Sequence, residues 1–406
     1  MSSNVLATSS IVAKTALAVL ENQLNFARAV NRDYEDEFTD NMARGYAPGQ
    51  TINIKKPPRY SVRKGRVAVP QATVEQTVPL TLAQEGCDIQ FTAAERTLSL
   101  TRLEDKIWAA MAPVANEIDR VGLEMARLNT FNAVGTVGTL PSTQATAIAT
   151  FANANQKLDE MAAPRDGRRA FIGNPAMNGA LLQGFAGLFN NGKQIDKQFD
   201  TGLIDTPYGL GFGLDQNVPT HTNGTQPTTG GTVNGAGQTG STITVNGGTI
   251  TGTITAGSVI TFANVFAVNP QNRQSTGALA QFVVTANVAA AATSIPISPA
   301  IVPSGNFQNV TASPANAAGI TVLGAASASY ASNIAFHKDA FTLAMVPMWA
   351  PPSGKDNISV SQKTHKGFTI KVTDLYDGIN DVSFMRLDVL YGYAATYPEL
   401  ATKVVA

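Results

Sequence analysis

A long uncharged segment constrains this chain more than any other feature of its sequence. Between Gln216 and His337 the single formally charged side chain is Arg273, although the chain has 29 basic and 29 acidic residues in all. Residues 241–246 and 259–262 alternate polar with β-branched or aromatic residues, which is the two-residue period of half-buried strands. We therefore expect an uncharged all-β domain inserted into a charged α+β chain, and such a body favours a surface or assembly module over a catalytic one.

Length and composition narrow the class of protein further. A chain of 406 residues exceeds what one core usually supports, so two or three compact bodies are expected. The formal net charge is zero, which argues against a protein whose main role is to coat nucleic acid with positive charge. Cys87 is the single cysteine, so no intrachain disulfide is expected.

The ends and the hydropathy of the chain give an expectation about its compartment. The first residues lack the basic start and apolar core of a signal peptide, and no run of about 18 apolar residues predicts a membrane span. The lone cysteine gives no sign of an oxidising compartment. We expect a chain that is made and used in a reducing cytoplasm, or inside a particle assembled there.

An extended stretch between Ile52 and Phe91 follows a break rich in proline and glycine. Alternation at 67–69 and at 74–78 predicts a long two-stranded loop. Two strands alone bury too little apolar surface to be stable in water. We therefore expect this loop to find its second layer on another subunit.

Charge is concentrated on both sides of the start of this loop, and these residues are the candidate subunit contacts. They form an acidic patch of Asp33, Glu35, Asp36 and Glu37, followed by a basic run of Lys55, Lys56, Arg59, Arg63, Lys64 and Arg66. The basic run could hold phosphates, but Tyr60 is its one interleaved aromatic residue. Complementary charge on copies of one protein steers and registers subunits, so contact between subunits is favoured over nucleic acid.

Apolar spacings of three and four predict helices at 10–31, in a long segment that begins at Thr101, and near 144–161. Thr101 and Glu104 form a capping box at the start of the long helix. We expect Pro113 to bend this helix, because a proline inside a helix removes a hydrogen bond and clashes one turn back. Gly135 and Gly138 are expected to end it.

The rest of the chain reads as mixed structure. A strand at 169–172 is followed by Asn174 and Pro175, which predict a new helix with asparagine as N-cap and proline in the first turn. Glycine-rich loops are expected over 184–215. After the uncharged segment, strands are expected at 358–361, 368–372 and 384–391.

Motifs for chemistry are weak in this sequence. Residues 235–240 satisfy the dinucleotide pattern GxGxxG, but β-patterned residues follow where a helix is required, so a surface turn is favoured. Residues 187–194 nearly match a phosphate-binding loop, but Gln194 replaces the magnesium-binding Ser or Thr. The histidines His221, His337 and His365 lack the spacing of metal ligands. We expect no enzyme activity and no cofactor.

Several segments, in order, carry a resemblance to a known family. These are residues 78–82 through Phe91 to 103–105, the strand and helix start at 170–175, the strand at 259–266, and the C-terminal segment 386–400. Together they resemble the P22-like major capsid proteins of tailed bacteriophages, which have the HK97-like fold. The match covers nearly the whole chain, although each segment alone is only moderately specific.

The resemblance implies a shell-forming α+β protein with this layout: an N-terminal arm at 1–50, an extended loop at 51–97, a spine helix and peripheral domain at 98–143, the first part of an axial domain at 144–221, an inserted β-barrel-like domain at 222–327, and returning strands at 328–406. It implies hexamers and pentamers of an icosahedral shell, assembled with a scaffolding protein and a portal in the host cytoplasm, around double-stranded DNA. It leaves open whether a decoration protein binds.

One departure from the family pattern stands out. P22-like insertions use a charged loop to contact neighbouring capsomers, and this insertion has Arg273 alone, so we expect ionic contacts of that kind to be weak or absent. Three alternatives to a phage shell remain: an encapsulin-like cage that encloses a cargo protein, a hydrolase that uses His337 or His365, and a tail or adhesin protein suggested by the Thr- and Gly-rich segment.

Overall fold

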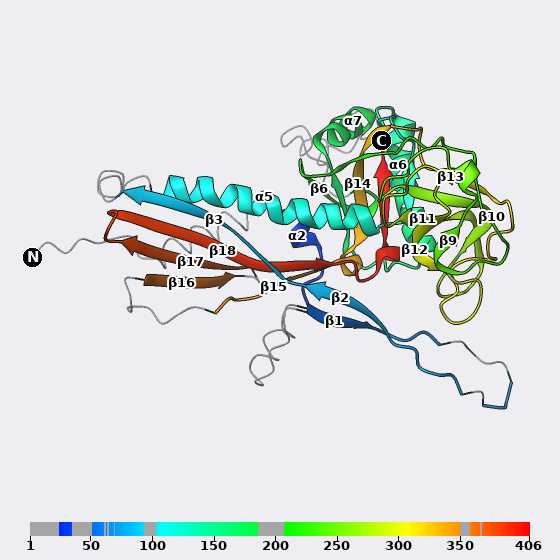
Figure 1. Ribbon diagram of the computed structural model, residues 1–406, viewed down its shortest axis with the longest axis horizontal. Helices are drawn as coiled ribbons and strands as arrows, with labels where there is room; N and C mark the ends of the chain where they lie inside the picture. The colour runs from blue at the N-terminus through cyan, green and yellow to red at the C-terminus, as the bar shows by residue number, and fades with distance from the viewer. Residues whose placement is uncertain are drawn as a thin grey trace, which may run out of the picture. The chain divides into compact units, whose positions relative to one another are not determined.

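The computed structural model describes residues 24–34, 51–60, 62, 65–68, 70–92, 103–185, 207–349, 358–365 and 368–406. They form two compact units, as the length predicts. Unit 1 comprises Met1–Ile54, Thr77–Gly122 and Thr342–Ala394, and unit 2 comprises Lys55–Gln76, Leu123–Phe341 and Ala395–Ala406. Figure 1 shows the elements of both units with their labels.

An antiparallel sheet of long strands forms the centre of unit 1 (Figure 1). Its order is β15 (Thr342–Met345), β18 (Val382–Ala394), β17 (Phe368–Asp377) and β16 (Ile358–His365), and β3 (Ala83–Thr92) also pairs with β18. The C-terminal strands that the sequence predicts at 358–361, 368–372 and 384–391 are confirmed, and each is longer than predicted.

The long helix α5 (Leu103–Asn129) packs closely on unit 1 through its middle turns. Gly122 lies so close to Phe26 and Tyr393 that a Cβ there would approach ring atoms of both to 2.7 Å. One turn earlier, the buried carboxylate of Asp119 accepts hydrogen bonds from the backbone N–H groups of residues 25–27, at 2.6–3.2 Å. These bonds satisfy the free N–H groups at the start of the short helix α2 (Phe26–Ala29).

The first sheet of unit 2 has the order β4 (Ala133–Gly135), β19 (Ala401–Val405), β14 (Ser329–His337), β5 (Arg169–Gly173) and β6 (Gly211–Leu214), with β7 (Thr220–Thr222) also paired to β14. The helices α6 (Gln144–Glu160) and α7 (Pro175–Phe185) complete its core, in which Phe151, Phe171 and Leu181 are fully buried. Asn174 caps α7 through its Oδ1, which accepts from Met177 N at 2.8 Å. The predictions for 144–161, 169–172 and Asn174–Pro175 are confirmed.

The uncharged segment folds into the second sheet of unit 2. The strand order is β8 (Gly231–Thr232), β13 (Gly319–Val322), β10 (Val259–Val268), β11 (Ser275–Val284), β12 (Ser294–Ile301) and β9 (Gly240–Thr244). A bridge between Val233 and Val245 joins the two edge strands, so the sheet closes on itself. Its interior is an apolar cluster that includes Phe262, Phe282 and Ile295.

Two expectations about helices are corrected by backbone pairing. Of the helix expected at 10–31, the described part is helical at Phe26–Ala29 alone, because Asn31 instead makes a parallel bridge to Thr342. The long helix ends at Asn129, before Gly135 and Gly138, because residues 133–135 pair in parallel with β19. The capping box at Thr101 lies outside the described residues.

Two expectations about loops are also corrected. The described residues 65–68 are not strand, and the return strand β2 (Gln76–Thr81) begins only at Gln76. Residues 211–214, expected in a loop, form β6, which pairs in parallel with β5. Among the described residues, no helix is long and apolar enough to span a membrane.

Candidate assembly surfaces

The extended loop begins and ends in a two-stranded sheet that packs on its own chain. β1 (Thr51–Lys56) pairs with β2, and the hydroxyls of Thr51 and Thr81 lie 2.9 Å apart. The inward side chains Ile52, Ile54 and Leu80 of these strands, and Leu82 directly after β2, join an apolar cluster with Ala344, Val346 and Ala394. The expectation that this loop finds its second layer on another subunit is therefore wrong for its base.

The described residues beyond the base present apolar side chains to solvent. Val62 is 94% exposed and Val67 is 79% exposed. The base is thus anchored within the subunit, while Val62 and Val67 lie exposed beyond it.

The basic run divides into outward and anchoring residues. Lys55 forms an ion pair with Glu75 at 3.0 Å, in which both side chains are largely exposed. The Nζ of Lys56 lies 5.2 Å from the ring centroid of Tyr397, and burial lowers the pKa of Lys56, an effect that Glu399 partly offsets. Arg59 donates from Nη2 to Glu399 Oε1 at 3.0 Å.

The other candidate contact residues are placed in part. Arg66 is exposed in the loop, and Asp33 is exposed in a turn where its backbone N–H donates to Asn31 Oδ1. The remaining candidates, Glu35, Asp36, Glu37, Arg63 and Lys64, lie outside the described residues. The acidic partners Glu75 and Glu399 carry no local sequence signal that identifies them, since Glu399 lies 340 positions from Arg59.

A buried basic network joins the end of α5 to β7, β19 and the inserted sheet. Arg127 Nη1 lies 2.6 Å from His221 Nδ1, and its Nε donates to Glu124 at 2.8 Å. Lys403 Nζ donates to Gly257 O at 2.8 Å. Burial, followed by the charge of Arg127, lowers the pKa of Lys403 to about 7. The sequence does not predict the burial of Lys403, because a lysine within a strand usually marks a solvent-facing position.

The geometry of His221 opposes a role as general base. Its Nε2 lies 3.0 Å from Ser258 Oγ, an arrangement that could suggest a nucleophile. Its Nδ1, however, faces the guanidinium of Arg127, which can only donate, so the ring proton sits on Nε2 and points at the serine. A base that activates serine needs the reverse tautomer, with a carboxylate at Nδ1. Burial, and then Arg127 and Lys403, lower the pKa of His221 to about 4.

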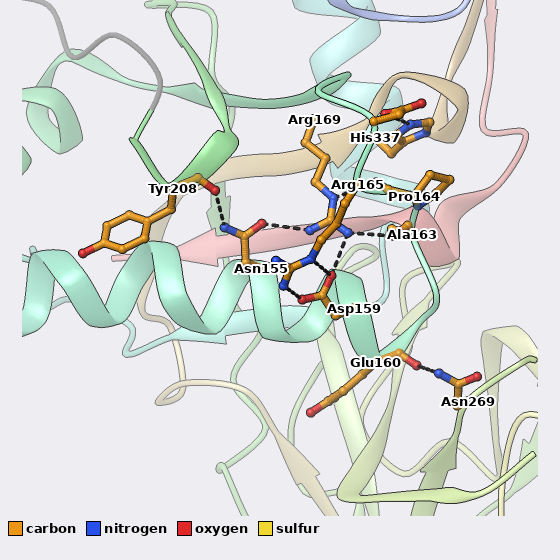
Figure 2. Close-up of polar contacts among 11 residues, drawn as sticks. Asn155, Asp159, Glu160, Ala163, Pro164, Arg165, Arg169, Tyr208, Asn269 and His337 are labelled. Carbon is orange, nitrogen blue, oxygen red and sulfur yellow. Dashed lines mark hydrogen bonds and ion pairs between the residues drawn. The ribbon is translucent and has the colours of Figure 1, made fainter. Parts of the chain in front are cut away.

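The turn after α6 is fixed by a buried arginine (Figure 2). Arg169 donates to Asn155 Oδ1 at 3.0 Å, to Asp159 Oδ1 at 2.7 Å, and to the backbone oxygens of Ala163 and Pro164 at 2.7 and 2.9 Å. Arg165 binds the same Asp159 from the surface, and hydrogen bonds from Arg165 and Arg169 lower the pKa of that carboxyl. These bonds tie the end of α6 to β5, which is a structural role.

His337 is likewise held in a structural role. Asp339 N donates to its Nδ1 at 3.3 Å, and its Nε2 lies 3.0 Å from Asp166 Oδ1. His337 is fully buried, so no substrate reaches it in this conformation. Where the structure describes the chain, no three potential ligands among His, Cys, Asp and Glu gather in a way that could hold a metal ion.

The GxGxxG segment forms a turn, as the sequence predicts. Gly235 and Gly237 both have positive φ, and Gln238 bridges the turn by donating to Asn234 O at 2.7 Å. The strand β9 follows at Gly240, so no helix N-terminus is present to face a pyrophosphate. The near match to a phosphate-binding loop at 187–194 lies outside the described residues.

Comparison with known proteins gives one family and several similar folds. The family described as P22 coat protein - gene protein 5 matches residues 73–404. No curated protein matches the chain. A structure from Mycobacterium phage Che8 aligns with a TM-score of 0.51 and 14% identity, over 94% of this chain and 90% of that one. This likeness shows a shared fold.

Two further structures are similar at a lower level. The capsid of Cyanophage P-SCSP1u has a TM-score of 0.41 and 11% identity, over 88% of this chain and 83% of that one. The mature capsid of bacteriophage PhiM1 has a TM-score of 0.42 and 10% identity, over 88% and 82%. With the family match over most of its length, the chain belongs to the P22 coat protein family and is a major capsid protein with the HK97-like α+β fold.

Proposed function

We propose that this major capsid protein assembles into hexamers and pentamers of a closed icosahedral shell that encloses double-stranded DNA. Assembly would take place in the host cytoplasm with a scaffolding protein and a portal, and the product is the virion shell. The family match supports this proposal, and it favours a phage coat over an encapsulin-like cage. The observation that carries it in this chain is the extended loop, which is anchored at its base and exposes Val62 and Val67 beyond it.

Charge on the loop would set the register between copies. Lys55 and Arg66 are exposed, so the described part of the loop presents basic side chains. Its complement would be the acidic patch of Asp33, Glu35, Asp36 and Glu37 on a neighbouring copy, because opposite charges steer association and exclude wrong registers. Lys56 and Arg59 would contribute mainly by fixing the base of the loop through Tyr397 and Glu399.

We assign parts of the chain to this work as follows: the arm at 1–50, the loop at 51–97, the spine helix and peripheral domain at 98–143, the axial domain at 144–221 and 328–406, and the inserted domain at 222–327. The inserted domain would lie on the outer surface. It carries one charged residue, so ionic contacts between capsomers would come from elsewhere.

The protein would act by assembly and have no chemistry of its own. His221 presents a proton to Ser258 where a general base would accept one, and His337 is fully buried against Asp166. These arrangements argue against the hydrolase alternative at both sites. The side chain of His365 lies outside the described part of the structure.

Shell formation is tested by expressing the full chain with a scaffolding protein and imaging the product by negative stain. We expect closed particles of uniform size. A matched pair of loop variants sharpens the test: Val67→Asp should abolish particles by placing a charge on the exposed apolar surface, whereas Val67→Ile should retain them. A stable monomer in every condition, or trimeric rods, would contradict the proposal.

A further inference from the structure

The one charged residue of the inserted segment contacts the extended loop of the same chain. Arg273 Nη2 donates to the backbone oxygen of Tyr60 at 3.2 Å. Arg273 lies in the turn between β10 and β11 with φ of 56°, in the left-handed region that side chains other than Gly, Asn and Asp rarely adopt. The turn around it is fixed by Asn269, whose backbone oxygen accepts from Arg273 N at 2.9 Å. The chain thus keeps an arginine where asparagine or glycine would fit with less strain.

A second segment of the insertion contacts the loop as well. Asn306 Nδ2 donates to Gln71 Oε1 at 3.2 Å. The guanidinium carbon of Arg59 lies 5.8 Å from the ring centroid of Phe307, within range of a cation–π interaction. The insertion therefore contacts the outgoing limb of the loop at residues 59–60 and the returning limb at Gln71.

Close packing is incomplete where the loop and the insertion meet. A cavity of about 460 Å³ is lined by Pro57, Pro58 and Arg59 of the loop and by Phe282, Pro299 and Phe307 of the insertion, with Phe131, Met161 and Tyr397 also in its wall. Surfaces that border a cavity lack part of their van der Waals contacts. Among the residues that the structure describes, none of the loop belongs to the apolar core of the insertion. The described loop residues can therefore leave the insertion without disturbing its apolar core.

We propose that the inserted domain acts as an intrachain latch, which holds the extended loop on its own subunit until a neighbouring copy takes the loop up. Arg273 makes the central contact of this latch, and Asn306 and Phe307 make the second contact. The latch rests on the proposed function, because shell assembly supplies the neighbour. It leaves Val62 and Val67 exposed, so the loop stays available while its path is restricted. The single charge of the insertion thus serves a contact inside the subunit.

The latch is tested on the full chain while it is unassembled. Arg59 is a trypsin site that contacts Phe307 of the insertion, so cleavage there reports how often the loop leaves the insertion, whereas exposed Lys55 and Arg66 give the rate at open sites. Arg273→Asn removes the guanidinium and tolerates the left-handed backbone. We expect it to speed cleavage at Arg59 about fivefold, the factor that corresponds to one net hydrogen bond. Sites outside the loop should be cut at the original rate.

The matched control is Gln274→Ala, the next residue in the same turn, whose side chain is exposed. It should leave the cleavage rate unchanged. Cleavage of Arg273→Asn at the original rate, or equal acceleration by Gln274→Ala, would overturn the latch. Both readings are made on unassembled protein, so they stand or fall independently of shell formation.

Locking the loop tests its release. In a Cys87→Ser background, Gln71→Cys and Asn306→Cys would be joined by a short bis-maleimide. We expect the cross-link to form in the unassembled chain and to prevent particles, whereas the same double variant without the cross-linker should assemble. A cross-link that does not form contradicts the contact, and normal particles from cross-linked protein contradict the need for release. Failure of the uncross-linked and unmodified chains to assemble would instead contradict the proposed function.

Discussion

At the residue scale, the least expected feature is a buried lysine in the C-terminal strand. Lys403 is 1% exposed, and its ammonium group donates to Gly257 O while Arg127 lies nearby. Glu124, paired with Arg127, is the carboxylate that offsets these charges. A buried ion pair or cation often contributes less to stability than a well-packed apolar side chain of similar volume. Lys403 therefore links β19 to the turn at Gly257 at a cost to the folded state.

That cost depends on pH. The pKa of Lys403 is about 7 in the folded chain against an ordinary 10.5. Between these values the unfolded chain binds the extra proton, so the stability of the folded chain rises with pH from about 7 to about 10.5. Lys403→Met should flatten this rise and increase the free energy of unfolding at pH 7. Denaturant unfolding at pH 7 and pH 9.5 measures both effects.

The control for this prediction is Lys55→Met, which replaces an exposed lysine and should leave the pH dependence of stability unchanged. An equal rise with pH in Lys403→Met and in the original chain would show that another group carries it. His221 titrates in a different window: its pKa is lowered to about 4 from 6.5, so its effect develops only as the pH falls below about 6.5.

At the element scale, two glycines in helices predict opposite outcomes of one substitution. Gly122 in α5 approaches Phe26 and Tyr393, so a Cβ there would meet ring atoms at 2.7 Å. Gly179 in α7 has no atom within 4 Å of such a Cβ. Alanine in a helix interior is more favourable than glycine by about 1 kcal/mol. Gly179→Ala should therefore stabilise the chain, whereas Gly122→Ala should destabilise it by about 1–3 kcal/mol through overpacking.

Thermal unfolding of both variants checks this pair. Each variant is the control for the other, because both gain the same helix propensity and differ only in the space available. A stabilising Gly122→Ala would mean that α5 and α2 separate readily, and that the close approach at Gly122 does not hold them together.

The elements also show which local signals suffice. Asn174 and Pro175 predict the start of α7 correctly, because an N-cap and a first-turn proline act on the next few residues alone. Gly135 and Gly138 mislead, because pairing with β19, more than 260 positions away, converts residues 133–135 into a strand. The sequence does not predict β19, because Lys403 interrupts the apolar pattern of a strand that is buried at every position.

The same limit applies to the candidate assembly surfaces. The basic run is evident as a cluster of like residues, but its division into outward Lys55 and anchoring Arg59 depends on Glu399, which only the folded chain brings close. The lack of charge in the insertion is visible in the sequence. The hydrogen bond from its one charged residue, Arg273, to the backbone oxygen of Tyr60 depends instead on the turn that positions Arg273 in the folded chain.

At the scale of the whole molecule, charge is divided so that the insertion is nearly neutral while the loop is basic. Exposed ionic contacts weaken with salt, because the screening length falls from about 10 Å at 0.1 M to about 3 Å at 1 M. The hydrogen bond from Arg273 is made to an uncharged carbonyl, so it should respond little to salt. Salt dependence of the shell should therefore follow the loop charges and be independent of the insertion.

Light scattering during assembly at about 0.1 M and about 1 M salt tests this division. We expect the original chain to assemble more slowly at high salt, and the double variant Lys55→Gln with Arg66→Gln to lose most of that difference, because these two exposed cations would face the acidic patch of a neighbour. Arg273→Asn should change the rate at both salt concentrations by nearly the same factor, since the contact that it removes is made to an uncharged carbonyl. A salt response that disappears in Arg273→Asn and persists in the loop variant would assign the ionic contact between capsomers to the insertion. That result would contradict the proposal that the inserted domain acts by holding the extended loop of its own chain.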